Sequence, residues 1–260
     1  MSRDMSHETP KCYATGHPIS NAVMLAFSQG CGGQVVPPSR LLDGPAVLYG
    51  FLRGTDIIYR HCRWIGREFF YIDHGYVGHR HFDGYYRVTR SGLQARPLGH
   101  GASFADDRWR LLGVALRPWR KAGSHVMVCP PSKAYSQFQG IDSSDWVQVV
   151  VAEVQRHTER PITIRPKPAG RDDVKLLSQL EDCWCLVTDS SNAAVEAIIG
   201  GVPAVVLGES AAKPVGWTFA DIEAPRWADR EPWAHALAYH QFTLEEMQSG
   251  LAWDHCRRQA

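Results

Sequence analysis

The spacing of apolar and polar residues along the chain predicts an α/β protein. Short apolar runs, typical of strands covered on both faces, alternate with segments whose apolar residues recur at helical spacing. The predicted strands cover residues 11–15, 34–36, 46–49, 68–72, 125–129, 161–165, 185–188 and 204–207. The predicted helices cover residues 22–28, 55–64, 146–157, 173–180, 193–199 and 244–255. This alternation predicts mainly parallel sheets, arranged as two Rossmann-like halves.

Residues 185–209 form the clearest βαβ pattern in the chain. An apolar run is followed by four helix-capping residue types, a helix that ends at two glycines, and a second apolar run. Backbone N–H groups at a helix start, flanked by the hydroxyls of Ser190 and Ser191, predict an anion site that includes Asn192. Glu196 follows one turn later, within reach of a ribose hydroxyl. An ordinary capped helix would show the same pattern, and this alternative stays open.

Two predicted strands of the first half end in residues that suit a binding site. Asp73 and His74 follow an aromatic strand, at the end where open α/β sheets place their chemistry, and Gly75 lets the backbone turn sharply. Gly16 and His17 form a turn after the first strand, where nucleotide-binding α/β folds admit a ligand. Asp73 could instead be a turn aspartate that binds local N–H groups, and Asp83 is a second candidate base.

Strand ends of the second half carry hydroxyl and basic residues. Ser132 and Lys133 follow the strand over 125–129, and Arg165 and Lys167 end the next strand. These hydroxyl and basic groups could bind a phosphate. Alternatively, Arg165 and Lys167 could simply be solvated residues at a strand end.

Residues 76–123 lack a regular pattern and are rich in glycine, aromatic residues and arginine. Within them, residues 108–121 combine several positive charges with two tryptophans. We interpret 76–123 as an acceptor-facing insert that leads into an interdomain linker, although a solvated surface loop would have the same composition. The predicted domains are therefore 1–123 and 124–260. A capping box at Thr243 and Glu246 begins the helix that closes the second domain.

Composition restricts the function classes without naming one. The net charge of +1 shows no global polyelectrolyte character, although a local patch could still bind nucleic acid. Seven scattered cysteines without paired spacing argue against a zinc knuckle and indicate reduced thiols in a cytoplasm. No apolar run approaches the roughly 20 residues of a membrane span, and no signal segment is expected. His74, His79 and His81 have no carboxylate at ligand spacing, so no metal is expected there.

Three short motifs resemble a glycosyltransferase family. Residues 72–75, Ile-Asp-His-Gly, resemble the Asp-x-Gly motif of bacterial sialyltransferases and capsule-polysaccharide Kdo transferases. Residues 164–168, Ile-Arg-Pro-Lys-Pro, resemble their His-Pro motif, and Ser190-Ser191 resembles their Ser-Ser/Thr motif. The layout over residues 11–210 is similar to the two-domain fold called GT-B. Lys167 stands where the family has histidine, and 260 residues imply a reduced N-terminal half.

The resemblance implies an inverting, metal-independent transfer from a nucleotide-sugar. Asp73, with His74 beside it, would be the general base on an acceptor hydroxyl. The donor-binding residues would be Ser132, Lys133, Arg165, Lys167, Ser190, Ser191, Asn192 and Glu196. Gly16, His17 and Gly75 would line the acceptor side. No cofactor is expected apart from the donor as co-substrate, and no Asp-x-Asp pair is evident for a metal.

Several alternatives remain at the level of sequence. The acceptor could be a glycan or a modified DNA base. The same fold could carry a nucleotide-sugar epimerase or hydrolase, which would need a second acid–base pair. A non-catalytic module that binds nucleotides or nucleic acid through residues 108–121 is a third possibility. The oligomeric state is left open.

Overall fold

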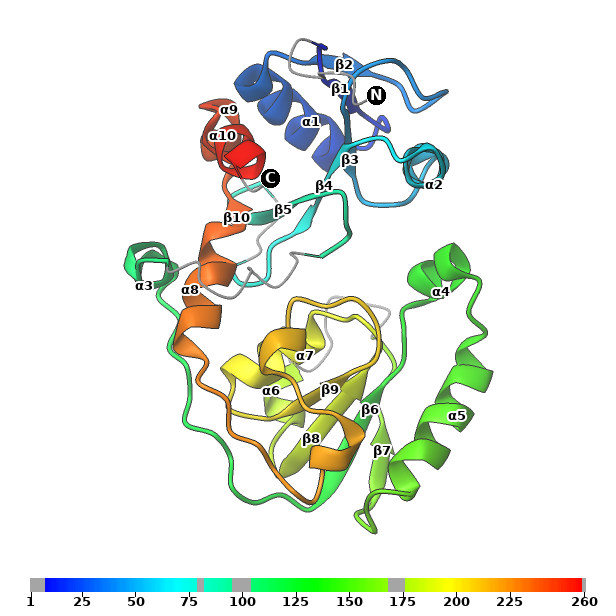
Figure 1. The fold of residues 1–260 in the computed structure, drawn as a ribbon, viewed down its shortest axis with the longest axis vertical. Helices are drawn as coiled ribbons and strands as arrows, with labels where there is room; N and C mark the ends of the chain where they lie inside the picture. Colours follow the sequence, from blue (N-terminus) through cyan, green and yellow to red (C-terminus); the bar gives the residue numbers. More distant parts are fainter. Residues whose placement is uncertain (1–7, 79–81, 95–103, 168–175, 259–260) are drawn as a thin grey trace. The chain divides into compact units, whose positions relative to one another are not determined.

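The computed structural model describes residues 8–78, 82–94, 104–167 and 176–258, and it confirms the α/β class. The described residues divide into two compact units (Figure 1). Unit 1 is drawn from residues 1–95 and 237–260, and unit 2 from residues 96–236. The predicted domains, 1–123 and 124–260, differ from these two units in two places. The C-terminal segment belongs with the N-terminal residues, and the chain enters unit 2 about 28 residues earlier than expected, at residue 96 rather than 124.

Unit 1 contains a six-stranded mixed sheet with the order β10-β5-β4-β3-β1-β2. Its strands are β1 (Lys11–Tyr13), β2 (Gln34–Val36), β3 (Ala46–Tyr49), β4 (Phe69–His74), β5 (Tyr86–Arg90) and β10 (Gln241–Phe242). Strands β2, β1, β3 and β4 are parallel, whereas β5 pairs with β4 and β10 pairs with β5 in antiparallel fashion. The predicted parallel strands are therefore present, and two strands that sequence analysis missed extend the sheet.

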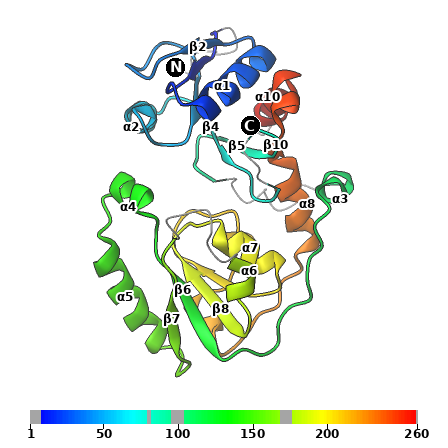
Figure 2. The same ribbon diagram turned by 180° about the vertical axis from the view of Figure 1, so that it is seen from behind.

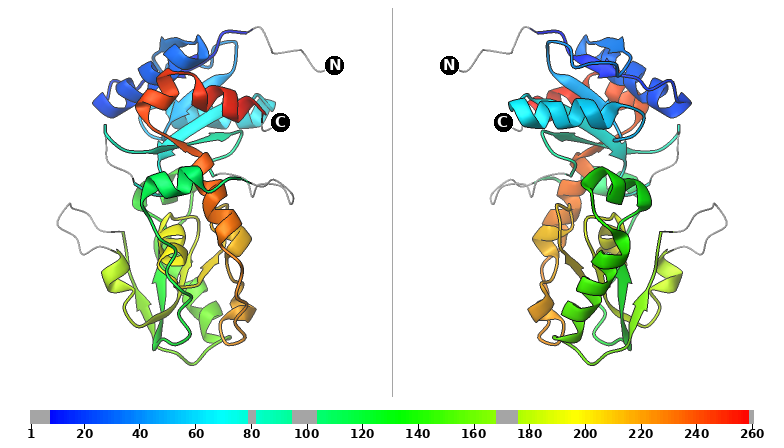
Figure 3. Two further views of the ribbon diagram at one scale, coloured as in Figure 1. Left: turned by 90° about the vertical axis from the view of Figure 1, so that its left-hand side faces the viewer. Right: turned by 90° about the vertical axis from the view of Figure 1, so that its right-hand side faces the viewer.

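Helices cover both faces of this sheet (Figure 3). On one face lie α1 (Pro18–Cys31), α9 (Leu244–Gln248) and α10 (Leu251–Arg258), and on the other lies α2 (Thr55–Ile65). The core beneath the first group includes Phe27, Phe70 and Phe242, each almost fully buried. Trp253 closes it, with its ring 4.8 Å from that of Phe70. On the other face, Tyr59 of α2 packs edge-on against Phe69 at 5.2 Å.

The C-terminal residues join unit 1 through specific contacts. The backbone N–H of Val88 donates to the carbonyl oxygen of His240, which begins the pairing of β10 with β5. The predicted capping box is present, with Thr243 and Glu246 exchanging hydrogen bonds. The predicted helix over 244–255 is instead two helices, because Gly250 has a left-handed φ of +88°. A side chain at Gly30 of α1 would lie 2.0 Å from the Met247 carbonyl oxygen, so glycine permits α1 and α9 to touch.

Unit 2 contains a four-stranded parallel sheet with the order β7-β6-β8-β9. Its strands are β6 (His125–Cys129), β7 (Ile162–Ile164), β8 (Cys183–Thr188) and β9 (Ala204–Val206). Helix α5 (Ser143–Gln155) packs on one face through Val150 and Val154, and α6 (Leu176–Gln179) and α7 (Ala193–Ile199) lie on the other (Figures 1 and 2). Residues 173–175 of the predicted helix 173–180 lie outside the described residues.

A tryptophan-rich loop completes the α5 face of unit 2. The backbone N–H of Trp217 donates to the Ala204 carbonyl oxygen, and its ring lies 5.6 Å from Trp184 and 5.4 Å from Trp227. Two short 3₁₀ turns, η1 (Lys213–Val215) and η2 (Phe219–Asp221), belong to this loop. The remaining helices are α3 (Asp107–Leu112), α4 (Lys133–Gln139) and α8 (Glu231–Tyr239). Within the part of the chain that the structure describes, no helix is long and apolar enough to cross a membrane.

The assignment of the C-terminal segment to unit 1 makes a testable prediction. Phe242→Ala should lower the free energy of unfolding by about 3–5 kcal/mol, because it leaves a cavity in the core under α1. Chemical denaturation followed by circular dichroism measures the change. Leu251→Ala is the matched control: its side chain lies in the same segment but is 43% exposed, so the change should stay within about 0.5 kcal/mol. Equal effects of the two substitutions would contradict the packing described here.

Candidate functional site

The parallel strands of unit 1 bring the predicted residues of the first half to one sheet edge. Because β1, β3 and β4 run in the same direction, their carboxyl ends meet there. Gly16 and His17 follow β1, Tyr49 ends β3, and Asp73 and His74 end β4. The turn after β1 is held by the first turn of α1, since Gly16 N–H donates to the Asn21 side chain at 3.1 Å. Gly16 has a φ of +81°, which requires glycine there.

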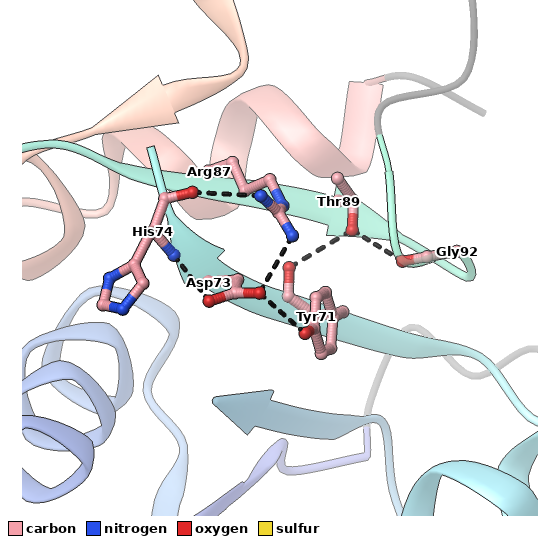
Figure 4. A network of polar contacts seen from close by, with 6 residues as sticks. All are labelled: Tyr71, Asp73, His74, Arg87, Thr89 and Gly92. Atoms are coloured by element: carbon pink, nitrogen blue, oxygen red, sulfur yellow. Dashed lines mark hydrogen bonds and ion pairs between the residues drawn. The ribbon is translucent and has the colours of Figure 1, made fainter. Parts of the chain in front are cut away.

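Asp73 is the centre of a polar network on this edge (Figure 4). Its Oδ2 lies 2.9 Å from Arg87 Nη2 and accepts a hydrogen bond from the Tyr71 hydroxyl at 2.9 Å. Its Oδ1 accepts the backbone N–H of His74 at 2.8 Å. Arg87 also donates through Nη1 to the His74 carbonyl oxygen at 3.2 Å. The ion pair follows from strand register, because Asp73 of β4 stands directly opposite Arg87 of β5.

The network keeps Asp73 ionised. The side chain of Arg87 is 8% exposed and that of Asp73 is 23% exposed. Burial by itself raises the pKa of the Asp73 carboxyl, but the charge of Arg87 and the hydrogen bonds from His74 and Tyr71 lower the pKa below its usual value. Burial and the neighbouring Asp73 raise the pKa of the Tyr71 hydroxyl well above 10.0, so Tyr71 remains a donor. Asp73 is therefore a carboxylate at neutral pH, and a weaker base than an ordinary aspartate.

His74 and Asp73 do not form one cluster of side chains. Successive residues of a strand point to opposite faces, and the imidazole of His74 points away from the carboxylate (Figure 4). The His74 ring instead lies 6.3 Å from the ring of Tyr49 in an edge-on arrangement. His74 thus hydrogen-bonds to Asp73 through its backbone N–H, and its imidazole acts on the carboxylate only by electrostatic attraction, which also lowers the pKa of Asp73.

Gly75 has a different role from the sharp turn expected of it. Its backbone N–H donates to the Tyr85 carbonyl oxygen at 2.9 Å. A Cβ atom at this position would lie 2.6 Å from that oxygen, so glycine lets the chain before β5 approach the end of β4. His79 and His81 lie outside the described residues.

The parallel strands of unit 2 bring a second group of predicted residues to one edge. Ser132 follows β6, Arg165 follows β7, Ser190 follows β8 and Gly208 follows β9. A Cβ atom on Gly208 would lie 2.7 Å from Oδ2 of Asp189, so the turns after β8 and β9 are in close contact.

Tyr135 connects two of these strand ends. Ser132 caps α4 by accepting the backbone N–H of Tyr135 at 3.3 Å. The Tyr135 hydroxyl accepts a hydrogen bond from Gln139 Nε2 at 3.0 Å and interacts with the side chains of Ser190 and Asp189. Burial raises the pKa of the Tyr135 hydroxyl above its usual value, whereas the hydrogen bonds with Ser190 and Gln139 lower it. The turns after β6 and β8 are therefore joined by side chains.

The start of α7 differs from the capped helix that was expected. The helix has seven residues, and Asn192 before it has helical backbone angles without a side-chain cap. Ser191 Oγ accepts the backbone N–H of Ala193 at 3.2 Å. The hydroxyl of Ser190 interacts with the hydroxyl of Tyr135.

The charged residues of this edge are unevenly placed. Arg165 is half-buried, and its side chain hydrogen-bonds to Gln179. Burial raises the pKa of the Glu196 carboxyl, and the charge of Arg165 lowers it, so these two residues interact. Lys133 and Lys167 are exposed, and Pro168 after Lys167 lies outside the described residues.

Two depressions of unit 2 lie apart from these residues. One, of about 680 Å³, is lined by β9 and the tryptophan loop, including Trp217, Phe219 and Trp227. The other, of about 660 Å³, is lined mainly by residues 155–161 and Glu223. Trp217 and Trp227 pack the loop against one another. Across the described ranges, no group of three His, Cys, Asp or Glu side chains could hold a metal ion.

Sequence analysis missed three residues of these networks: Tyr71, Arg87 and Tyr135. Arg87 lies in the segment 76–123, for which no regular structure is predicted, although Tyr86, Arg87, Val88 and Thr89 alternate as in a strand with one polar face. Tyr135 is placed by α4, which is too short to show helical periodicity. Neither Arg87 nor Tyr135 belongs to a recognisable sequence motif.

The fold is similar to two solved glycosyltransferase structures. One is the Thermosulfurimonas dismutans KpsC β-Kdo 2,4 transferase, with 13% identity, a TM-score of 0.54, and coverage of 90% of this chain and 92% of that chain. The other is the β-Kdo 2,7 transferase of KpsC from the same organism, with 13% identity, a TM-score of 0.55, and coverage of 94% and 99%. No protein-family profile matches the sequence, and no curated protein matches it. At this identity the likeness establishes the fold.

The Asp73–Arg87 pair makes a prediction about stability. Arg87→Met should lower the free energy of unfolding by about 3–5 kcal/mol, because it leaves a largely buried carboxylate without its counter-charge. The double variant Asp73→Asn with Arg87→Met should recover much of that loss. Urea denaturation of the parent, the two single variants and the double variant measures the coupling free energy between the two residues. Additive single effects would contradict a direct interaction.

The same pair predicts a pH dependence. The folded-state pKa of Asp73 lies below the unfolded value of about 3.9, so the unfolded state binds more protons in acid. Its contribution to stability is complete above about pH 5 and is lost as the pH falls through the folded-state pKa. The parent should therefore lose more stability between about pH 5 and pH 2 than the double variant does. Parallel pH curves for the two proteins would show that Asp73 is not stabilised as a carboxylate.

Proposed function

We propose that this chain is a GT-B-like glycosyltransferase that transfers a sugar from a nucleotide-sugar donor to an acceptor hydroxyl. The main support is the fold similarity to two Kdo transferases over 90% or more of both partners in each comparison, combined with a carboxylate at the end of β4. The neighbours' names make Kdo the first donor sugar to test. The first acceptor to test is a glycan, as the resemblance of the sequence motifs implies. This proposal also takes the two units as the two Rossmann-like halves of that fold, the first of them modified by β5 and β10.

The proposed chemistry on the acceptor side uses Asp73. In an inverting transfer, the acceptor oxygen forms a bond to the anomeric carbon while the bond from that carbon to the donor phosphate breaks. The electron pair of the broken bond leaves with the phosphate, and the acceptor proton moves to the Asp73 carboxylate. Arg87 and Tyr71 make Asp73 a weak base, so proton transfer would occur late, when the new bond has made the acceptor hydroxyl acidic. Arg87 is thus a positioning residue that also sets this basicity.

The proposed donor side uses the strand ends of unit 2. Ser190 and Tyr135, which interact with each other, would donate hydroxyl hydrogen bonds to the donor phosphate. Arg165 supplies positive charge at the same edge, and the exposed Lys133 and Lys167 would add to it when a phosphate is bound. Glu196, which interacts with Arg165, would accept from a ribose hydroxyl. Ser132 and Ser191 would position the turns that bind the phosphate, because each accepts a backbone N–H in its turn. Asn192, the next residue after Ser191, would belong to the same donor-binding turn.

The first experiment identifies the donor. A thermal-shift screen with CMP-, UDP-, GDP- and TDP-sugars tests binding directly, because a ligand that binds only the folded state raises the melting temperature. A shift with one nucleotide class and with no other supports the proposal. Transfer that persists in excess chelator would support the metal-independent mechanism, and loss of transfer that added Mg²⁺ restores would refute it.

Asp73→Asn should reduce transfer about 10²- to 10⁴-fold, the usual cost of losing a general base. Donor binding should be retained and the protein should still fold, because asparagine can accept from Arg87 and Tyr71, but its stability should be lower since Arg87 loses its counter-charge. Single-turnover assays with saturating donor measure the effect. Asp83→Asn, at an exposed aspartate on the connection between β4 and β5, is the matched control and should behave like the parent. Near-normal turnover in Asp73→Asn would remove this residue from the mechanism.

Ser190→Ala combined with Tyr135→Phe should weaken nucleotide binding by roughly tenfold or more, since each hydroxyl lost would be a hydrogen bond to a charged group. The stability cost should remain near 1 kcal/mol. Isothermal titration calorimetry with the donor from the screen measures the affinity. Ser144→Ala, at the start of α5, controls for the loss of a hydroxyl at a helix start. An unchanged affinity in the double variant would place the phosphate elsewhere.

A further inference from the structure

Helix α2 has two faces of different character. Toward the sheet it buries Thr55, Ile58 and Cys62, each no more than 1% exposed. Away from the sheet it carries Ile57 at 64% exposure and Trp64 at 88% exposure. These two residues are separated by two helical turns and therefore lie on the same outward face. The buried face accounts for the packing of α2 in unit 1, and the outward residues add nothing to it.

Further large apolar side chains adjoin this face. Ile65 at the end of α2 is 49% exposed, and Leu52 just before the helix is 50% exposed. Single exposed hydrophobic residues are common on protein surfaces, but four within fourteen residues form a patch that calls for a partner. Helix α2 lies on the outside of unit 1, on the sheet face opposite α1 and α10 (Figure 3).

Positive charges surround the same patch. Arg53, Arg60 and Arg63 are exposed among the apolar side chains, and His61 lies between Ile57 and Trp64 on the outward face. The acidic residue of the helix, Asp56, stands in its first turn. Arg67, beyond the helix, lies 3.6 Å from Asp43. Residues 52–65 therefore carry three arginines against one aspartate.

We propose that the outward face of α2 docks onto a membrane surface that contains anionic phospholipids. A short amphipathic helix with arginine, tryptophan and aliphatic residues lies in the plane of such an interface, with its apolar side chains at the acyl boundary. The indole of Trp64 suits the headgroup level, and the arginines bind lipid phosphates. This surface shares no residue with the proposed transferase site, and it would place the protein at a membrane surface.

The charge pattern favours lipid over other occupants. A second copy of the chain would bring three arginines against three arginines, which disfavours association. A nucleic acid would bind the arginines but would leave Leu52, Ile57 and Ile65 in contact with water. An anionic bilayer satisfies both kinds of group.

Vesicle flotation with the full chain tests the proposal. The protein should float with vesicles of phosphatidylcholine and phosphatidylglycerol, and bind pure phosphatidylcholine vesicles at least about tenfold more weakly, since each arginine near an anionic surface contributes roughly fivefold. Trp64→Asp should abolish flotation, and Trp64→Phe should retain most of it. Arg60→Gln with Arg63→Gln should reduce binding on the order of tenfold and lower its sensitivity to salt, with Arg53 remaining.

The matched control lies on an exposed helix face of unit 2. Val149→Ala with Arg156→Gln removes one apolar and one basic side chain from the α5 region and should not alter flotation. Thermal unfolding verifies that each variant is folded. Failure of the folded parent to bind anionic vesicles would overturn the proposal. Self-association that Trp64→Asp abolishes, without vesicle binding, would assign the face to a second copy. Vesicle flotation and self-association are measured without a sugar donor or an acceptor. A negative result in either can therefore be told apart from a negative result in the transferase assay.

Discussion

The antiparallel pairing of β5 with β4 is the constraint on which unit 1 depends. It places Arg87 opposite Asp73, which makes a buried carboxylate tolerable at the end of β4. It also provides the strand beside which β10 pairs. Once β10 is in place, α9 and α10 follow and cover the face that α1 shares with them. One strand pairing thus determines both the electrostatics of Asp73 and the membership of the C-terminal segment.

The sequence predicted most of the parallel strands because each is an apolar run of the expected length. It could not predict β5, whose arginines at positions 87 and 90 resemble those of a solvated loop until their partners, Asp73 and Glu68, are known. The two-residue strand β10 is too short for any periodic signal. The two units differ from the predicted domains for the same reason, since the contacts that join the C-terminal segment to β5 and α1 link residues far apart in sequence and leave no local signal.

For the candidate site, the strand-end rule placed Asp73, Ser132, Arg165 and Ser190 correctly on two sheet edges. The position of a residue at a strand end gives no information on the direction of its side chain. The sequence therefore placed His74 beside Asp73, although strand geometry directs the two side chains to opposite faces of the sheet. The partners that tune the site are long-range contacts. Arg87 and Tyr135 reach their partners only after strands and helices have been assembled, and no local pattern records this.

The neighbouring strands β5 and β10 are separated along the chain by residues 91–240, which include the whole of unit 2. During synthesis the ribosome therefore completes every residue of unit 2 before it produces the last strand of unit 1. The first 95 residues emerge with an open sheet edge at β5 and an uncovered apolar face on α1, and they must wait in that state. Unit 2 is continuous in sequence and can fold during this interval, and a folded unit is more compact than an unfolded chain of the same length, which lowers the entropic cost of closing so long a connection. The order of translation thus allows unit 2 to fold before the sheet of unit 1 is complete.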